Sequence, residues 1–361
     1  MGIKMEVNSK YSFQNNDMGN ESRQSGRLTP DIARVFNCCI DTRDQNSADD
    51  CLTNAASVSL ERTKPAKTIQ VFTHNNANRQ MSKLMCDSIV NNSTSDIIFI
   101  STEEMKNLSG AMRSSLSQSQ YVIVYNSAQK MLTVTKPKEL LSLITNPAST
   151  AQITLVKKGV TAPIIIDRFT YRDMFNNPNK GGTITIQSIG DMKIAMVNIH
   201  LDSRDQDERK KEINDLLCKI NNKHTDIDHI IIAGDFNTRN RKLQGRLIRA
   251  LQDEASFRSE LGVPLKYEIT LPVISPQENT YKWEAGLNVE AKPGSKRQRN
   301  GEMQTGYLDG VVILTPKNDV KNKALVNCKI VPEGNSIVGP SFGSDHRSVT
   351  AKFAIEQMRL S

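Results

Sequence analysis

Short apolar runs, each followed by polar residues, recur along most of the chain. The clearest lies at residues 230–237, where three isoleucines and an alanine precede Gly234, Asp235 and Asn237. β-Branched runs of this length are typical of buried central strands, and the exits of such strands often carry active sites. Asp235 and Asn237 are two residues apart, so an extended backbone presents both on one face. A carboxylate and an amide on one face suit a hard cation, a water to be deprotonated or a phosphate oxygen. An ordinary turn is the alternative, because Asp and Asn are common in turns.

The periodicity of the other apolar residues predicts further strands, with helices between them. Strands are expected at residues 68–73, 96–100, 121–124, 151–156, 183–189, 193–201, 307–314 and 348–355. The Gly190-Asp191 turn joins two of these strands into a hairpin. Helices are expected near residues 81–89, 207–222 and 243–261. This pattern predicts an α/β (α+β) fold, a layered sandwich of two mixed, mostly antiparallel sheets flanked by helices.

The first 66 residues differ in composition from the rest of the chain. They are rich in Asn, Ser, Asp, Gln and Arg and show no sustained apolar periodicity. Such a segment cannot bury enough apolar surface to offset the entropy lost on folding. We therefore expect residues 1–66 to form a polar, disordered N-terminal extension and residues 67–357 to form one folded domain.

Charge and cysteine content narrow the class of partner and the compartment. The chain has a formal net charge of +8 and a pI of about 9.1, which favours an anionic partner: nucleic acid, an acidic membrane surface or a phosphorylated small molecule. Its six cysteines form no CxxC pair, and scattered thiols suit a reducing compartment. No apolar run approaches the roughly 20 residues that a membrane-spanning helix needs.

Polar residues stand at one end of six predicted strands. Any one of them alone is more often a turn or surface residue, but their recurrence at the same topological place, with complementary chemistry, predicts a shared site. These residues are Asn75, Glu104, His200, Asp235 with Asn237, Asp309, and Asp345 with His346.

The order of these residues resembles the endonuclease/exonuclease/phosphatase superfamily, which includes DNase I-like nucleases, neutral sphingomyelinases and inositol polyphosphate 5-phosphatases. Gly-Asp-Phe-Asn at 234–237 is shared across the superfamily. Three further motifs are similar to the 5-phosphatases in particular: Asn179-Lys180-Gly181-Gly182, Thr280-Tyr281-Lys282 and Ser344-Asp345-His346-Arg347. Two departures concern substrate preference: Asn279 replaces a proline of the family pattern, and Gly310 follows Asp309 where the family usually has an arginine.

This resemblance implies a catalytic domain that hydrolyses a phosphate ester with Mg²⁺. Glu104 and Asn75 would be metal ligands, since Mg²⁺ takes few protein ligands and prefers oxygen. Asp235 would activate the attacking water, and Asn237 would hold a phosphoryl oxygen. The two histidines would donate to the phosphate, His346 oriented by Asp345 or a neighbour and His200 held by Asp309.

The same resemblance implies a set of substrate-binding residues. Tyr281 and Lys282 would contact a phosphate next to the scissile one, supplemented by Arg297 and Arg299, because arginine binds phosphate bidentately. Asn179 and Lys180 would face the 1-phosphate side of an inositol ring, and Arg347 completes the set. For the basic loop at 292–299, a solvated surface is the alternative.

The expected activity is a 5-phosphatase acting on phosphatidylinositol 4,5-bisphosphate or the 3,4,5-trisphosphate, or on a soluble inositol phosphate. Two alternatives remain open, a phosphodiesterase of the same superfamily and a non-catalytic phosphoinositide-binding protein. Only 5% of residues are aromatic, which disfavours nucleic acid as the partner. We expect a cytoplasmic protein in peripheral contact with anionic membranes. The polar extension also suits a secreted bacterial effector acting in a host cell.

Overall fold

The computed structural model describes most of the chain beyond residue 59. The described residues are 60–62, 67–79, 81–105, 109–130, 149–171, 180–203, 205–238, 241–243, 246–248, 250–274, 279–281, 306–317 and 328–360. Four predicted substrate-binding residues, Asn179, Lys282, Arg297 and Arg299, lie outside this set, as does nearly all of the predicted extension. These residues and the domain boundary at 66/67 therefore stay predictions.

Strands dominate the described residues. They are β1 (Leu60–Arg62), β2 (Lys67–Arg79), β3 (Ile97–Met105), β4 (Tyr121–Lys130), β5 (Ser149–Lys157), β6 (Ile164–Tyr171), β7 (Gly181–Ile189), β8 (Met192–His200), β9 (His229–Asp235), β10 (Arg241–Leu243), β11 (Arg246–Ile248), β12 (Tyr267–Thr270), β13 (Asp309–Pro316), β14 (Cys328–Pro332), β15 (Ile337–Val338) and β16 (Val349–Leu360). The helices are α1 (Lys83–Asn91), α2 (Ser109–Ser117), α4 (Gln206–Lys223), the 3₁₀ helix η3 (Ala250–Gln252) and α5 (Glu254–Leu261).

Two sheets contain most of these strands. The first has the order β1-β16-β2-β3-β5-β4, with β14 and β15 also paired to β16, and the second has the order β12-β13-β9-β8-β7-β6. The pairs β2–β3 and β8–β9 are parallel, whereas the other described pairs are antiparallel. The predicted sandwich of two mixed, mostly antiparallel sheets is confirmed.

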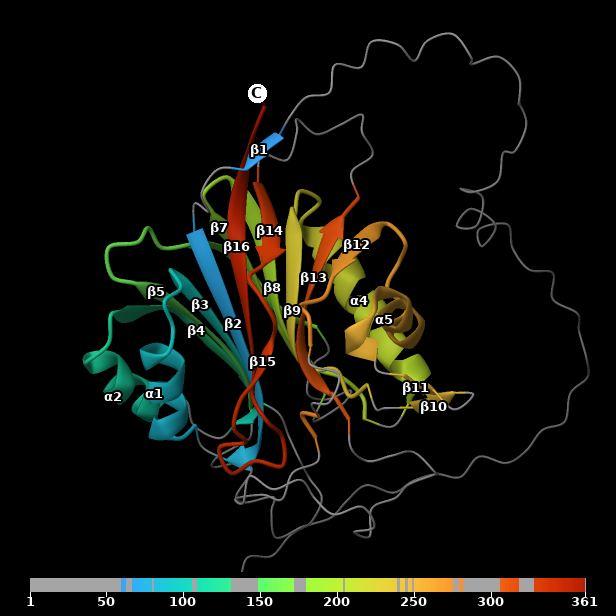
Figure 1. The fold of residues 1–361 in the computed structure, drawn as a ribbon, viewed down its shortest axis with the longest axis horizontal. Coiled ribbons are helices and arrows are strands. Elements are labelled where there is room, and N and C mark those ends of the chain that lie inside the picture. The colour runs from blue at the N-terminus through green and yellow to red at the C-terminus, as the bar shows by residue number, and fades with distance from the viewer. Residues whose placement is uncertain are drawn as a thin grey trace, which may run out of the picture. The chain divides into compact units, whose positions relative to one another are not determined.

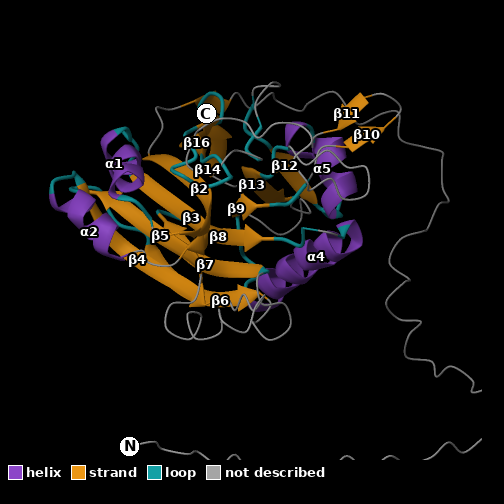
Figure 2. Ribbon diagram, turned by 90° about the horizontal axis from the view of Figure 1, so that it is seen from below, coloured by secondary structure: helices purple, strands orange, loops and turns teal. Residues whose placement is uncertain are grey.

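The sheets and helices form four layers around three apolar cores. In Figure 1, α1 and α2 lie on the outer side of the first sheet, and α4 and α5 lie on the outer side of the second; the view in Figure 2 shows the same arrangement. Residues of β9 alternate between cores. Ile230 and Ile232 pack toward α4 and α5, whereas Ile231 and Ala233 pack against the first sheet. This period of two explains why the run is apolar throughout, since both faces of the strand are buried.

Polar side chains also join the two sheets inside the sandwich. The Asn198 amide on β8 donates to the carbonyl oxygens of Thr102 (3.1 Å) and Ala151 (2.7 Å) on the first sheet. Gln187 on β7 donates to Thr154 Oγ1 at 3.1 Å. Hydrogen bonds are directional, so these contacts fix the offset of one sheet against the other more sharply than apolar packing does.

The predicted elements agree with the structure apart from one helix. The predicted helix at 207–222 corresponds to α4, whose N-cap Asp205 accepts hydrogen bonds from two backbone N–H groups. The helix predicted at 243–261 is wrong in its first half. Two short strands and η3 precede α5, which begins at Glu254 because the side chain of Asp253 caps it by accepting from the Ser256 N–H.

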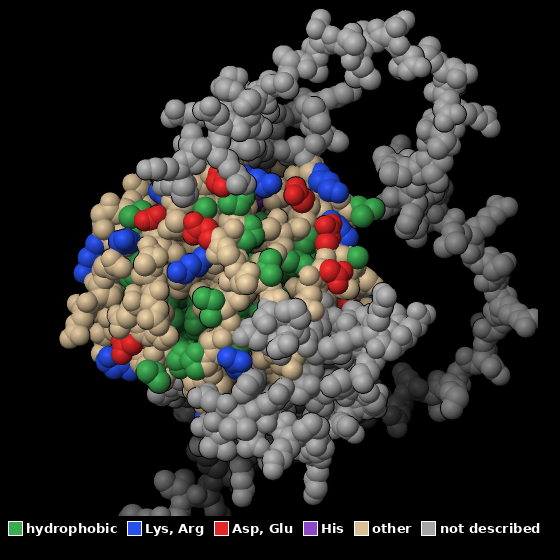
Figure 3. Space-filling view, in the orientation of Figure 1, with side chains coloured by type: hydrophobic (Ala, Val, Ile, Leu, Met, Phe, Trp, Pro, Cys, Tyr) green, Lys and Arg blue, Asp and Glu red, His purple; other side chains and the backbone are tan. Residues whose placement is uncertain are grey.

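Among the described helices, none combines the length and apolar character that a membrane crossing requires. On the face shown in Figure 3, Lys and Arg side chains are interspersed with Asp and Glu. Peripheral contact with an anionic membrane stays a prediction.

Candidate active site

Strand register brings three of the predicted residues into line across the second sheet. Asp235, the last residue of β9, is opposite His200 of β8 on one side and Asp309 of β13 on the other. All three side chains are almost completely buried. They lie on the face of the sheet that Ile231 and Ala233 also occupy, because residues two apart share a face. The site therefore opens from the interior of the sandwich at the ends of its strands.

Gly234 makes the close approach of β8 and β9 possible at this point. Its φ is +144°, and a Cβ placed on it would lie 2.0 Å from the backbone oxygen of Ile199. No side chain can occupy that space, and the backbone of β8 cannot move without disturbing its pairing. Glycine at this position is therefore required by geometry, and it holds Asp235 against His200.

Asp235 is held as a carboxylate by its neighbours. Its Oδ1 accepts from the Asn237 N–H at 2.9 Å, and its Oδ2 accepts from the Asn75 amide at 3.2 Å. Burial would raise the pKa of Asp235. The neighbouring His346, His200 and Lys180 outweigh this effect and hold the pKa of Asp235 below its usual value. The Asn237 amide donates to the Leu201 oxygen at 2.9 Å, so in this structure it braces the exit of β8.

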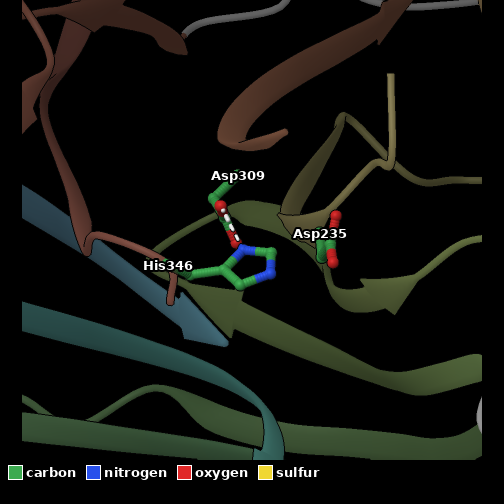
Figure 4. Close-up of side chains that lie close together, drawn as sticks. All are labelled: Asp235, Asp309 and His346. Atoms are coloured by element: carbon green, nitrogen blue, oxygen red, sulfur yellow. Dashed lines mark hydrogen bonds and ion pairs between the residues drawn. The ribbon is translucent and has the colours of Figure 1, made fainter. Parts of the chain in front are cut away.

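Asp309 holds His346, which corrects the predicted pairing with His200. The distance from His346 Nδ1 to Asp309 Oδ2 is 2.8 Å, and Figure 4 shows the imidazole between Asp309 and Asp235. Although burial would lower the pKa of His346, the Asp309 carboxylate raises it to about 10. Burial raises the pKa of Asp309 to about 6 despite the opposing effect of His346. At neutral pH the two groups therefore form an ion pair. The sequence could not show this, because Asp309, the first residue of β13, is close to neither histidine along the chain.

His200 has a different environment. Its Nε2 lies 2.7 Å from Lys180 Nζ, 3.5 Å from Asp235 Oδ2 and 3.9 Å from Glu104 Oε1. Burial, and after it the charge of Lys180, lowers the pKa of His200 to about 3. This imidazole is therefore neutral at physiological pH, whereas that of His346 is charged.

The first sheet contributes Asn75 and two glutamates. Asn75 of β2 is in register with Glu103 of β3, and both belong to the face that points toward the second sheet. Glu103 is fully buried and its Oε1 accepts from Ser101 Oγ at 3.1 Å. Burial, followed by Asp309 and Asp235, raises its pKa well above the usual value. The neighbouring Glu104 is part-exposed, and burial raises its pKa against the effect of Lys180.

Sequence reasoning singled out Glu104 and missed Glu103. The signal was present, because Ile97, Phe99, Ser101 and Glu103 alternate along β3 and the first two lie in the core between the sheets. Thr280 was also missed as a structural support. Its Oγ1 accepts from the backbone N–H groups of Leu308 (2.8 Å) and Asp309 (3.0 Å), so it fixes the start of β13.

The non-glycine residues with left-handed backbone conformations in the described chain all flank this site. They are Ala77 (φ 47°), Glu104 (φ 48°), Asn237 (φ 51°) and Phe342 (φ 49°). Such conformations cost about 1–3 kcal/mol each and occur mainly where the surrounding structure enforces them. Ala77 and Glu104 lie within the last three residues of β2 and β3, Asn237 follows β9, and Phe342 lies shortly before His346. The strain is therefore concentrated near the candidate residues.

The residues at the centre fit a divalent cation. Asp235 and Asp309 offer carboxylate oxygens within 4.8 Å of each other and of a ring nitrogen of His346, which is protonated and so is not itself a ligand. Within the described part of the chain, Glu103 Oε2 and Asp309 Oδ1 are buried without a hydrogen-bond partner. A buried carboxylate oxygen without a partner is costly, and a bound cation would remove that cost. Oxygen donors of this kind suit a hard ion such as Mg²⁺ or Ca²⁺.

Comparison with known families agrees with this geometry. Residues 72–262, which are 191 of the 361, match the model of endonuclease/exonuclease/phosphatase family 2. The chain belongs to this family. Family membership assigns it to the hydrolases of phosphoester bonds and confirms the resemblance drawn from the motifs. A comparison with curated proteins finds no match.

Solved structures similar to this family member include an inositol polyphosphate 5-phosphatase domain. That domain, from SpSynaptojanin in complex with inositol (1,4)-bisphosphate and calcium ion, is 14% identical, with a TM-score of 0.51 over 84% of this chain and 87% of that chain. Two further structures are similar. A Cimex nitrophorin is 12% identical, with a TM-score of 0.47 over 80% of this chain and 98% of that chain. D. rerio TDP2 complexed with single strand DNA product is 14% identical, with a TM-score of 0.45 over 79% of this chain and 98% of that chain. At 14% identity, the likeness to the SpSynaptojanin domain establishes the fold.

The structure places the remaining predicted residues of this family member in different surroundings. The Tyr281 ring lies 4.6 Å from that of His346, so this tyrosine reaches the group of buried catalytic candidates. Arg347 donates to the backbone oxygens of Gly339 (2.7 Å) and Val338 (3.1 Å). Asp345 is part-exposed beside His346, and its charge helps to raise the pKa of that histidine. The substrate-binding roles of these residues stay predictions.

The ion pair between Asp309 and His346 predicts a pH-dependent stability. The pKa of His346 is raised from 6.5 to about 10 on folding, so its contribution is complete below pH 6.5 and is lost as pH rises through about 10. We expect the difference in free energy of unfolding between wild type and His346→Gln to shrink between pH 6.5 and 10, measured by urea titration with chelator present. His224→Gln, at the C-terminal end of α4, is the matched control. A difference that stays constant over this range would contradict the ion pair.

Proposed function

We propose that this chain is a Mg²⁺-dependent inositol polyphosphate 5-phosphatase that acts on phosphatidylinositol 4,5-bisphosphate or a related inositol phosphate. One observation carries the proposal. Residues of two motifs typical of 5-phosphatases, Lys180 and Tyr281, reach the same buried centre as the residues common to the superfamily. The bound inositol (1,4)-bisphosphate of the similar SpSynaptojanin domain supports the same substrate class.

In this proposal, Asp235 orients and deprotonates the water that attacks phosphorus. Its two oxygens are already fixed by Asn75 and Asn237, so little reorganisation is needed when the water binds. The protonated His346, held by Asp309, donates to an oxygen of the phosphate as negative charge develops there. A positioned acid or base typically contributes about 10²–10⁴-fold in rate.

The metal would be held by Glu104, with the Asn75 oxygen and the unpartnered oxygens of Glu103 and Asp309 around it. When bound it would neutralise phosphate charge and stabilise the leaving oxygen. The buried acids explain why a cation is needed here: Asp235, Asp309 and Glu103 raise one another's cost of ionisation. A phosphate monoester group, which carries up to two negative charges, could not approach them without a compensating positive charge.

The deciding experiment measures phosphate release from phosphatidylinositol 4,5-bisphosphate in mixed vesicles, with Mg²⁺ and with chelator. We expect release only with Mg²⁺, leaving the lipid 4-phosphate. The same samples are then tested on soluble inositol phosphates, plasmid DNA and sphingomyelin. Cleavage of DNA or sphingomyelin without monoester hydrolysis would place the chain among the phosphodiesterases. Binding of phosphoinositides without any hydrolysis would identify a non-catalytic binding protein.

A further inference from the structure

The strongest unexplained contact at the site joins Lys180 to His200. Lys180 immediately precedes β7, and the first residue of that strand, Gly181, is in register with His200 on β8. This pairing brings Lys180 Nζ to 2.7 Å from His200 Nε2. The resemblance to 5-phosphatases placed Lys180 at the far side of the inositol ring, away from the reacting phosphate. The structure instead places its ammonium group among the catalytic side chains.

The chemistry of the two groups determines the direction of this hydrogen bond. A lysine ammonium has three N–H donors and no acceptor, so His200 Nε2 must accept. The imidazole proton then resides on Nδ1. The other polar atoms near Nε2, Asp235 Oδ2 at 3.5 Å and Glu104 Oε1 at 3.9 Å, lie beyond the usual length of a hydrogen bond. Lys180 is therefore the partner that selects the tautomer.

Lys180 is part-exposed and lies among acidic side chains. Burial lowers its pKa, but Asp235 and Glu104 oppose that effect, followed by Glu212 and Asp202. The bond to His200 uses one of the three ammonium N–H groups. An ammonium group held by His200 near the predicted base and the predicted metal ligand is well placed to receive a phosphoryl oxygen.

We infer that Lys180 is the group that donates to the oxygens of the scissile phosphate on this side of the site, and that His200 is a positioning residue that holds Lys180. This inference rests on the proposed function and deepens it. It reverses the expected role of His200, because a nitrogen that accepts from Lys180 cannot donate to phosphate. It also distinguishes the two histidines: His346 is charged and donates, whereas His200 is neutral and accepts.

The tautomer can be tested without substrate or metal. The full-length chain contains five histidines, so ¹⁵N-histidine labelling and the spectrum of His200→Gln would assign the His200 resonances. We expect an unprotonated Nε2 and a protonated Nδ1 in the wild type. In Lys180→Met, Nε2 should gain the proton and donate to Asp235. A wild-type His200 that already carries its proton on Nε2 would overturn the inference, as would a Lys180→Met spectrum without change.

The phosphate contact is tested with inorganic phosphate and with the lipid substrate. Lys193, a part-exposed lysine at the other end of β8, provides the control variant. Inorganic phosphate should shift the His200 resonances of the wild type and of Lys193→Met, but not those of Lys180→Met. With phosphatidylinositol 4,5-bisphosphate, Lys180→Met should lower kcat about 10²–10³-fold with little change in KM, the usual effect of removing one transition-state donor. Lys180→Arg should restore part of the rate. An effect on KM alone would assign Lys180 to a remote phosphate and refute the proposal.

These readouts separate the inference from the function it rests on. If the wild type hydrolyses no phosphoinositide or inositol phosphate, the proposed function fails, while the tautomer and the phosphate titration still decide the placement of Lys180. If the wild type is active and Lys180→Met keeps its kcat, the inference fails and the proposed function stands.

Discussion

Asp235→Asn is expected to lower kcat for phosphate release about 10²–10⁴-fold, the range for loss of a positioned base. Asparagine has nearly the same shape as aspartate, and its amide oxygen can still accept from the Asn237 N–H that now binds Oδ1 at 2.9 Å. What is lost is the capacity to take a proton from water. The measurement is initial-rate kinetics with phosphatidylinositol 4,5-bisphosphate, together with thermal unfolding to verify that the variant is folded.

Asp226→Asn is the matched control for this variant. Asp226 lies shortly before β9, is largely exposed and pairs with Lys193, so the change removes a carboxylate of the same chain segment outside the site. Its rate should equal that of the wild type. An Asp235→Asn enzyme with near-normal kcat would show that another group activates the water, and Glu103, a fully buried acid of the site that is not paired with His346, would become the candidate.

Gly234→Ala is expected to destabilise the fold by about 3 kcal/mol or more, the combined cost of overpacking and of a strained backbone. The added Cβ would lie 2.0 Å from the Ile199 oxygen, at a φ of +144° that L-residues rarely adopt. The obstacle is the backbone of a central strand, which cannot rotate away as a side chain could. Urea-induced unfolding followed by circular dichroism measures the loss.

Gly190→Ala provides the comparison at a site without crowding. Gly190 also has a positive φ (+61°), but nothing lies within 4 Å of the position of its Cβ. Only the left-handed conformation is penalised there, at about 1–2 kcal/mol. Equal losses for the two variants would show that backbone conformation, rather than the contact between β8 and β9, makes Gly234 necessary.

The sandwich was predictable because its signals are local. Apolar residues alternate along β7 and β8, which indicates strands. The run of β9 is apolar throughout, which indicates a strand buried on both faces. The helix at 243–261 failed for a local reason as well: Asp253 caps a helix that starts there, and apolar spacing before it does not distinguish a helix from short strands.

The site was predictable as a set of residues but not as a set of contacts. The recurrence of polar residues at the ends of predicted strands identified His200, Asp235, Asp309 and His346. It could not say which histidine Asp309 holds, because that depends on how β8, β13 and the segment before β16 are arranged across two sheets. The position of Lys180 depends on the same register, since one residue of slip between β7 and β8 would reverse the faces.

The contact that closes the site joins parts of the chain that are far apart in sequence. Ser344 Oγ donates to the backbone oxygen of Asn75 at 2.6 Å across a separation of 269 residues. Contacts of such separation form late, because the entropy of closing the intervening loop is lost before the contact is gained. A refolding chain can therefore regain the β7–β8 hairpin and helix α4 well before Asp309, His346 and Asn75 meet. Recovery of catalysis is therefore expected to report on the joining of these distant segments rather than on the formation of β-structure.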